Sequence, residues 1–462
     1  PNSYIAERYS RENLFPYLFS HSVGYVGNLN DDSLQEILSL QDLSPKETIF
    51  KYSNGFLSGK TGIENVYDQE LRGFFGKKIY EVDASGRLLK EIDTIPAIDG
   101  KDIHTSLDLK SQQVAFRELK NRRGSVVAVD ISDGAIVTYL SSPSFSVNKI
   151  ANGLSQNDFN ELIEDKNKPF FDRAAQGRYS PASTIKPAIG LFGLENNIID
   201  WDFTIDDPGY FELPEDGRIY RGWKKGGHGK INLQDAIIES SNTFFFSLAY
   251  KSEIEELIKH LSYFGFGRNV CLDCFLPDNG LLPNPAWKMN TLNFGWFKGD
   301  TVNLGVGQGY MSATPLQLAY YSAFIANKGT LNRFSFVQDD RTIPKDVFYS
   351  SNIDDSDWEK IHKSMIGVIE KPKGTAGRLR ELKDYIIAAK SGTVELVSTD
   401  TKEDYKIIRE EEAKRDHAII VAFGPMPNPK YAVSVVIENG ESGGSVAGPV
   451  AIEVLNSLLD YE

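Results

Sequence analysis

Ser183-Thr184-Ile185-Lys186 is the segment of this 462-residue chain from which its architecture and chemistry are most directly predicted. The segment follows Pro181 and leads into apolar residues, a pattern typical of a helix start. On a helix, the i, i+3 spacing places the serine and the lysine on one face. There, a lysine whose pKa is lowered by burial and nearby cations can take the hydroxyl proton, which makes the serine a useful nucleophile.

Two further motifs follow this segment. A single S-x-x-K is weak evidence, because Ser146-Val147-Asn148-Lys149 fits the same pattern in a segment predicted to be a loop. However, Ser240-Ser241-Asn242 comes at the end of a helical pattern, and Lys390-Ser391-Gly392-Thr393 follows an apolar strand at 386–389. Three such motifs in this order are the signature of penicillin-binding proteins and class A β-lactamases. The order therefore predicts a serine acyl-transfer enzyme.

Each predicted catalytic residue has a physical role in acyl transfer. Ser183 is the nucleophile, and Lys186 is its base. The Ser240 hydroxyl can relay a proton to the leaving amine, and Asn242 can hold Lys186 and a substrate amide by paired hydrogen bonds. Lys390 supplies a second cation, which lowers the pKa of Lys186 and attracts the terminal carboxylate of a D-Ala-D-Ala peptide.

The residues after Lys390 are predicted to bind substrate. Gly392 keeps an edge strand open, so that the substrate backbone can dock as an added strand beside Ser391 and Thr393. The backbone N–H groups of Ser183 and Thr393 are the expected donors to the oxyanion.

The chain is predicted to contain two domains, because 462 residues exceed what one small core accommodates. Residues 1–108 are a patchwork of short segments with turn signals, typical of a small β-rich module. Residues 109–462 form the second domain. Strands flank Asp133-Gly134, helical patterns fill the middle, and strands return at Ala418–Phe423 and Tyr431–Ile437. This order predicts an α/β (α+β) fold with an antiparallel sheet flanked by helices.

Composition and charge exclude several function classes. The chain carries 50 basic and 64 acidic residues, a net charge of −14, without a recurring Lys/Arg cluster, so we expect no nucleic-acid partner. It contains no run of eighteen apolar residues, which indicates a soluble protein or one whose membrane anchor has been removed. We also expect no cofactor.

The only cysteines, Cys271 and Cys274, form a C-x-x-C. This spacing is compatible with a redox pair, half of a zinc site or a local disulfide. No βαβ pattern precedes the motif and no second C-x-x-C exists, so we expect two incidental small apolar side chains. A disulfide is the next interpretation, if the segment turns tightly enough.

The sequence also resembles a known family over nearly its whole length. The segments similar to elongation-type class B penicillin-binding proteins, the penicillin-binding protein 2 family, are Asp207–Gly209, Trp223–Gly229, Glu239–Phe245, Lys298–Thr301, Gly305–Tyr310 and Ala313–Pro315. Upstream, His21–Gly27 and Gly62–Tyr67 resemble that family's pedestal. The resemblance implies a pedestal over 1–108 and a DD-transpeptidase (penicillin-binding) domain, with the serine transpeptidase and β-lactamase-like fold, over 109–462.

This resemblance implies a function, a location and partners. A member of the family would be a peptidoglycan DD-transpeptidase that cross-links stem peptides during lateral cell-wall elongation. It would join a D-Ala-D-Ala donor to an acceptor amine through an acyl-enzyme on Ser183, release D-Ala, and be inhibited by β-lactam antibiotics. Members lie on the periplasmic side of the bacterial inner membrane, and we expect their N-terminal anchoring helix to have been removed from this chain. The implied partners are a RodA-like glycosyltransferase and an MreC-like scaffold.

The sequence departs from the family pattern in two places. Some relatives bind zinc beside the active site through two Asp, a His and a Cys. Here Asp207 and His228 match, but Gly222 and Ser241 stand at the other two positions. Two ligands rarely suffice for a closed tetrahedral site, so we expect no metal and a structural, hydrogen-bonding His228. Ala182 also replaces the glycine usual before the nucleophile, and we expect it to tighten the turn.

A β-lactamase and a β-lactam sensor are the alternative interpretations. A β-lactamase needs a positioned base for water, and no Glu-x-x-Leu-Asn segment of the class A type follows Ser183 at a suitable distance. A sensor, or a scaffold with a dead pocket, is disfavoured by the complete set of catalytic side chains and by the pedestal motifs. Fast turnover of a penicillin adduct would favour the β-lactamase.

Overall fold

The structure is a computed structural model that describes residues 11–28, 57–74, 76–337, 353–396 and 410–460. The chain divides into two compact units. The first contains described residues of 1–105, 144–165 and 273–275, and the second contains those of 106–143, 166–272 and 276–462. The first unit therefore also takes segments from beyond residue 108. Within the described residues, no helix is both long and apolar enough to span a membrane.

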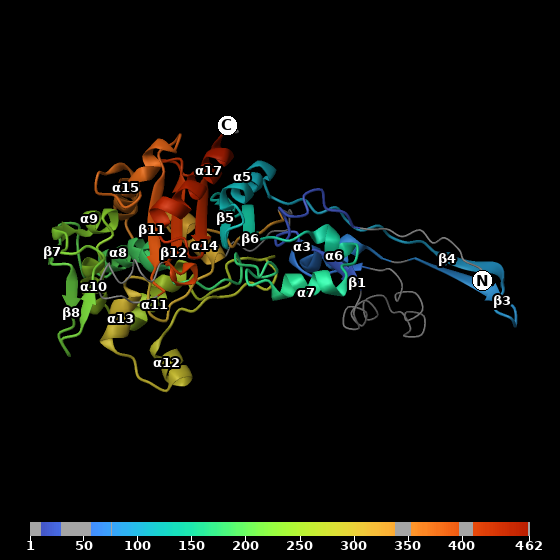
Figure 1. Ribbon diagram of the computed structural model, residues 1–462, viewed down its shortest axis with the longest axis horizontal. Helices are drawn as coiled ribbons and strands as arrows, with labels where there is room; N and C mark the ends of the chain where they lie inside the picture. The colour runs from blue at the N-terminus through green and yellow to red at the C-terminus, as the bar shows by residue number, and fades with distance from the viewer. Residues whose placement is uncertain (1–10, 29–56, 75, 338–352, 397–409, 461–462) are drawn as a thin grey trace. The chain divides into compact units, whose positions relative to one another are not determined.

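An antiparallel sheet of five strands forms the centre of the second unit (Figure 1). In spatial order its strands are β11 (Ala388–Val394), β12 (His417–Gly424), β13 (Tyr431–Ile437), β5 (Gly124–Asp130) and β6 (Ile136–Ser142). The β5–β6 hairpin closes at the predicted Asp133-Gly134 turn. Because β5 and β6 come from early in the chain and the other strands from its end, distant segments build one sheet. The predicted fold class is confirmed.

Helices cover this sheet on both faces, since its strands are buried at nearly every successive position. Figure 1 shows α5 (Leu109–Leu119) and α17 (Gly448–Leu459) next to each other beside the sheet. The core helix α14 packs against β12, β13 and β5. The bounds of this helix and of the others in the unit are α14 (Pro315–Ala326), α8 (Lys186–Glu195), α9 (Leu233–Ile238), α10 (Asn242–Tyr250), α11 (Ile254–Tyr263), α12 (Pro285–Leu292), α13 (Lys298–Leu304) and α15 (Asp355–Glu370).

Two small strand pairs complete the second unit. Strand β7 (Thr204–Asp207) pairs with β10 (Gly229–Asn232), and β8 (Tyr210–Glu212) pairs with β9 (Ile219–Arg221). Both lie between α8 and α9 in the chain. The segment that they form leads into α9, and the Ser240-Ser241-Asn242 motif follows that helix.

The first unit contains short elements, as predicted for a small β-rich module. Its strands form two antiparallel pairs, β1 (Val26–Asn28) with β2 (Leu57–Gly59) and β3 (Lys77–Val82) with β4 (Leu88–Ile95). Its short helices are α3 (Gly62–Val66), α4 (Asp68–Arg72), α6 (Val147–Ala151) and α7 (Gln156–Glu164). Ser146 precedes α6 as its N-cap, so the prediction of a loop at this second S-x-x-K is wrong.

Candidate active site

Ser183 lies on a tight helical turn at the start of α8. The 3-10 helix η1 (Ala182–Ile185) runs directly into α8, so the predicted helix start has a 3-10 first turn. In a 3-10 helix, residues three apart eclipse one another, which keeps Ser183 and Lys186 on the same side. Ser183 is half-buried, and its hydroxyl makes no hydrogen bond to any residue that the structure describes. The hydroxyl that the sequence predicts as the nucleophile is therefore not engaged by another described side chain.

The residue before Ser183 holds a strained conformation. Ala182 has a φ of 48°, in the left-handed region that costs about 1 kcal/mol or more for a residue with a Cβ. Its N–H donates to the carbonyl oxygen of Gly307 at 2.9 Å, and the Ser180 hydroxyl donates to the same oxygen. A Cβ on Gly307 would lie 2.4 Å from the Ala182 oxygen. Gly307 can therefore approach Ala182 closely, and its carbonyl oxygen holds the turn that carries Ser183.

Two buried lysine amines surround the hydroxyl of Ser240. Lys186 Nζ donates to Ser240 Oγ (3.2 Å), to the Ser240 carbonyl oxygen (2.8 Å) and to Asn242 Oδ1 (2.7 Å). Lys390 Nζ donates to Ser240 Oγ at 3.0 Å and to the Ser391 carbonyl oxygen at 3.0 Å. The structure thus brings Lys186, Ser240, Asn242 and Lys390 together, next to the turn that carries Ser183.

Burial sets the protonation of these amines. Burial and then the positive charge of Lys390 lower the pKa of Lys186 well below 10.5, while the carboxylate of Asp207 acts in the opposite direction. Burial lowers the pKa of Lys390 to about 7. An amine in this pair can therefore lose its proton near neutral pH and act as a base.

The turn that carries Ser240 joins α9 to α10. Ser240 has a φ of 57°, a second strained position at the site. Its carbonyl oxygen also accepts a hydrogen bond from Trp223 Nε1 at 3.1 Å. Ser241 is the N-cap of α10, and its hydroxyl accepts from the N–H of Phe244. These bonds direct the Ser240 and Asn242 side chains toward Lys186.

The Lys390–Thr393 segment lies on β11, the edge strand of the sheet. A Cβ on Gly392 would lie 3.0 Å from Thr184 Cγ2 and 3.2 Å from the Pro181 oxygen. Gly392 therefore lets β11 pack closely on the turn of Ser183, a reason that the sequence interpretation lacked. The side chain of Ser391 is hydrogen-bonded to that of Thr375 at 2.8 Å, and Thr393 is exposed.

Sequence reasoning missed three contributors to this site. Trp223 is predicted only as part of a segment that resembles the family, and Thr375 carries no sequence signal. Asp207 is predicted only as part of such a segment and as a possible metal ligand, yet its carboxylate contacts Ser241 and His228. These contacts join segments that are 34 and 21 residues apart, so they depend on how the strands pair.

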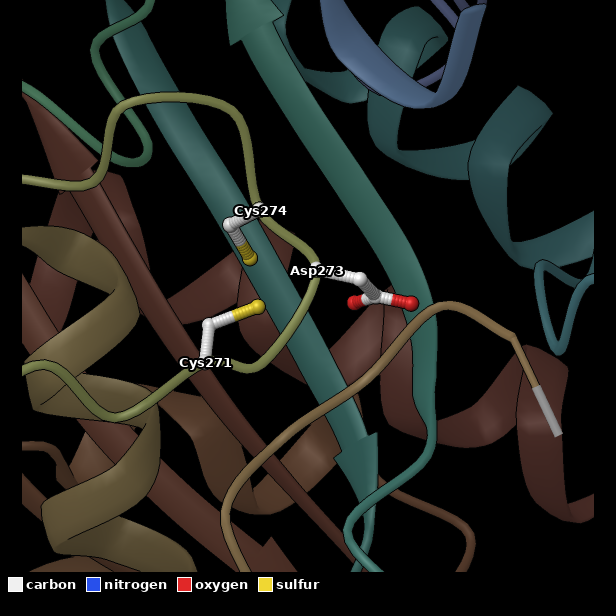
Figure 2. A group of neighbouring side chains, drawn as sticks. All are labelled: Cys271, Asp273 and Cys274. Carbon is white, nitrogen blue, oxygen red and sulfur yellow. The ribbon is translucent and has the colours of Figure 1, made fainter. Parts of the chain in front are cut away.

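Among the described residues, the only group of three or more closely spaced potential metal ligands is Cys271, Asp273 and Cys274. Figure 2 shows the two sulfur atoms facing each other across the loop, with Asp273 to one side. Neither cysteine is free, since they form a disulfide. The expectation of two incidental thiols is wrong because the loop turns back tightly enough for a bond. No thiolate remains to hold a metal here.

The residues at the relatives' zinc position do not fit a closed zinc site. Asp207 Oδ2 accepts hydrogen bonds from the Ser241 hydroxyl (2.7 Å) and His228 Nδ1 (2.5 Å), and Oδ1 accepts from the Gly209 N–H (2.7 Å). Gly222 offers no side chain. The two candidate ligands are bonded to each other, which leaves the four-ligand shell of zinc unfilled.

Comparisons with known proteins agree with this geometry. Residues 124–456 match the family described as the penicillin-binding protein transpeptidase domain, and residues 1–105 match the penicillin-binding protein dimerisation domain. The chain belongs to the penicillin-binding protein transpeptidase family. The resemblance inferred from the motifs is thereby confirmed.

Curated relatives of this penicillin-binding protein are named peptidoglycan D,D-transpeptidase MrdA. The Acinetobacter baumannii protein is 38% identical over 96% of the chain, and that of Escherichia coli K12 is 33% identical over 97%. The chain spans about two thirds of their lengths, 64% and 70% respectively.

Solved structures of penicillin-binding protein 2 have the same fold. The Pseudomonas aeruginosa protein in complex with WCK 5153 has a TM-score of 0.83 and 35% identity, and the match covers 98% of this chain and 92% of that one. The Helicobacter pylori protein in complex with MreC has a TM-score of 0.83 and 30% identity, with 98% of this chain and 79% of that one covered.

Proposed function

We propose that this penicillin-binding protein is a peptidoglycan DD-transpeptidase that cross-links stem peptides during lateral cell-wall elongation. The observation that carries the proposal is the placement of the Ser240 hydroxyl between the amines of Lys186 and Lys390, beside the turn of Ser183. A nucleophile, a base of lowered pKa and a proton relay are the groups that serine acyl transfer needs. The names of the relatives support the same activity.

In the first step, Ser183 Oγ attacks the carbonyl carbon between the two D-alanines, and Lys186 takes the hydroxyl proton. The N–H groups of Ser183 and Thr393 stabilise the oxyanion. The C–N bond then breaks as the Ser240 hydroxyl gives its proton to the leaving amine and takes the proton held by Lys186, and D-Ala departs. In the second step, an acceptor amine attacks the ester carbonyl, its proton passes through Ser240 and Lys186 to Ser183 Oγ, and the ester C–O bond breaks to free Ser183.

The edge strand supplies the substrate-binding surface in this proposal. A donor peptide docks antiparallel to β11 along Ser391, Gly392 and Thr393, because an edge strand offers unpaired backbone groups. The ammonium group of Lys390 attracts the terminal carboxylate of the donor. Asn242 holds a substrate amide as well as Lys186.

Incubation with a fluorescent penicillin and then with peptides tests the function. A β-lactam mimics the donor, so we expect a covalent adduct that persists for many minutes. A donor ending in D-Ala-D-Ala, mixed with an acceptor amine, should release D-Ala and form a cross-linked product. Fast loss of the adduct with hydrolysed antibiotic would instead indicate a β-lactamase, and a stable adduct without any D-Ala release would indicate a sensor.

The pH dependence of acylation is expected to be bell-shaped. The second-order rate constant should rise with pH as Lys186 loses its proton, because only the neutral amine is a base. It should fall again above a pH of about 7, as Lys390 loses the charge that attracts the carboxylate. Stopped-flow labelling from acid to alkaline pH measures both limbs.

A penicillin ester that lacks the free carboxylate is the matched control for this profile. With the ester, the alkaline fall should disappear while the acid limb stays in place. A rate constant that is flat across neutral pH would contradict the assigned roles of both lysines.

We further propose the periplasmic side of the bacterial inner membrane as the location, with a RodA-like glycosyltransferase and an MreC-like scaffold as partners. The solved complex of the similar Helicobacter pylori protein with MreC supports the scaffold. A RodA-like enzyme would polymerise the glycan strands that this chain cross-links. Titration of the chain with a purified MreC homologue from a relative should give saturable binding, and none at all would contradict the assignment of the scaffold.

A further inference from the structure

A buried carboxylate lies behind the turn that carries Ser240. Asp207 accepts hydrogen bonds from the Ser241 hydroxyl, from His228 Nδ1 and from the Gly209 N–H, at 2.7, 2.5 and 2.7 Å. A carboxylate can only accept, so Nδ1 of His228 is the donor. The side chains of Asp207 and His228 are 1% and 3% exposed, and both are withdrawn from water.

Strand pairing brings these groups together. Asp207 ends β7 and pairs with Gly229, the first residue of β10, so the preceding His228 reaches the carboxylate directly. The N–H of His228 also donates to the Asp207 carbonyl oxygen at 3.1 Å. The aspartate and the histidine therefore form a rigid pair at the end of this strand pair.

The pair is connected to the catalytic groups through Ser241. Its hydroxyl donates to Asp207 while it caps α10, and it stands between Ser240 and Asn242, which both contact Lys186. The negative charge of Asp207 also lies near the N-terminus of α10, where the helix dipole favours it. A shift of Ser241 would move both contacts of Lys186.

The strained backbone of Ser240 gives the connection a physical role. With a φ of 57°, this residue costs about 1–3 kcal/mol and keeps its conformation only if its surroundings impose it. Trp223 holds its carbonyl oxygen from one side, and the Ser241–Asp207 bond fixes the next residue. Without that bond, the Ser240 hydroxyl would be free to leave its place between the two amines.

We propose that Asp207, His228 and Ser241 form a hydrogen-bonded clamp, without a metal ion, that positions Ser240 and Asn242 against Lys186. The proposal rests on the function proposed above. The clamp lies where some relatives would bind a zinc ion. Here the Asp207 carboxylate already accepts three hydrogen bonds, and Gly222 and Ser241 do not supply the two further ligands that zinc would need. The three residues touch no substrate and act as positioning residues.

Burial raises the pKa of Asp207, but hydrogen bonds from Ser241 and His228 outweigh it, so that pKa lies below its ordinary value. The aspartate is therefore ionised across the working pH range, and the clamp stays intact there.

The test separates acylation by a fluorescent penicillin into the dissociation constant K and the acylation rate constant k2. Ser241→Ala should lower k2 by about 10- to 100-fold, because a displaced Ser240 no longer lines up with the reacting groups. K should stay within about twofold, since Lys390 and β11 are untouched. An unchanged k2 would overturn the proposal.

Thr314→Val is the matched control for loss of a buried cap. Thr314 caps α14 through its hydroxyl, as Ser241 caps α10, but it contacts no group of the site. We expect a similar loss of melting temperature and a k2 within about twofold of the wild type. If both variants lose k2 equally, general destabilisation explains the effect and the clamp is refuted.

A pair of variants at His228 tests the hydrogen bond itself. His228→Asn keeps an N–H near the place of Nδ1 and should retain k2 within about threefold, whereas His228→Leu removes the donor and should lower it about tenfold or more. Equal values for the two variants would contradict the clamp.

Dialysis of the wild-type chain against a chelator tests the absence of a metal. The value of k2 should not change, and a loss restored by zinc would overturn the metal-free clamp. These outcomes are distinct from failure of the proposed function, which would appear as no labelling of the wild type at all.

Discussion

Ser183→Ala is expected to abolish covalent labelling by a fluorescent penicillin. Removing the nucleophile of a serine acyl-transfer enzyme costs about a million-fold in rate, which is beyond detection here. The fold should stay intact, because Ser183 is half-buried and its hydroxyl bonds to no described residue. Circular dichroism checks the fold, and mass spectrometry of the labelled wild-type peptide locates the adduct.

Ser146→Ala is the control for this result. Ser146 begins the other S-x-x-K segment, at the N-cap of α6 in the first unit, and its loss should leave labelling unchanged. An adduct that persists in Ser183→Ala, or one that disappears in Ser146→Ala, would show that the nucleophile has been misassigned.

Lys186→Met is expected to have the second largest effect. Loss of a general base lowers the acylation rate by about 100- to 10,000-fold. Methionine fills much of the same buried space, but the Ser240 carbonyl oxygen and Asn242 Oδ1 each lose a donor. Binding should change little, since the residues of β11 remain, so the loss should appear in k2 rather than in K.

The same variant should alter how stability depends on pH. The pKa of Lys186 is lowered in the folded state, so the unfolded chain binds more protons between that lowered pKa and 10.5. The stability of the wild type should therefore rise with pH in this window, and Lys186→Met should lack that contribution. Thermal melts at increasing pH measure this effect. The melting temperature of the wild type, relative to that of Lys186→Met, should rise as the pH rises.

Lys149→Met provides the control in the first unit, where the lysine belongs to the short helix α6. Neither its acylation rate nor the pH dependence of its melting should differ from the wild type. A Lys186→Met chain that acylates at the wild-type rate would require another base.

Motif order could be read from the residues alone because acyl transfer demands particular groups. The motifs predict a site for this chemistry wherever they lie in the chain: a hydroxyl and an amine three residues apart at a helix start, a second hydroxyl with an amide, and a second amine on an edge strand. The apolar runs at 418–423 and 431–437 likewise predict strands that pair in one sheet, because such runs are stable only when both faces are covered.

The positions of these groups in space depended on packing. Two lysines converge on Ser240 because β11 lies against the turn of Ser183, and Gly392 makes that approach possible. The state of the cysteine pair also depended on the tertiary structure. The C-x-x-C spacing permitted either two thiols or a disulfide, and the path of the loop decided between them.

The sequence by itself therefore determined the family, the fold class and the types of chemical group at the site, since each of these follows from residue identity and order. Tertiary structure alone decided that the Asp207 carboxylate contacts Ser241, and that Ser240 is held in a left-handed conformation between two amines. The physical reason is that hydrogen bonds between distant segments depend on strand register and close packing, and neither is written in any local pattern.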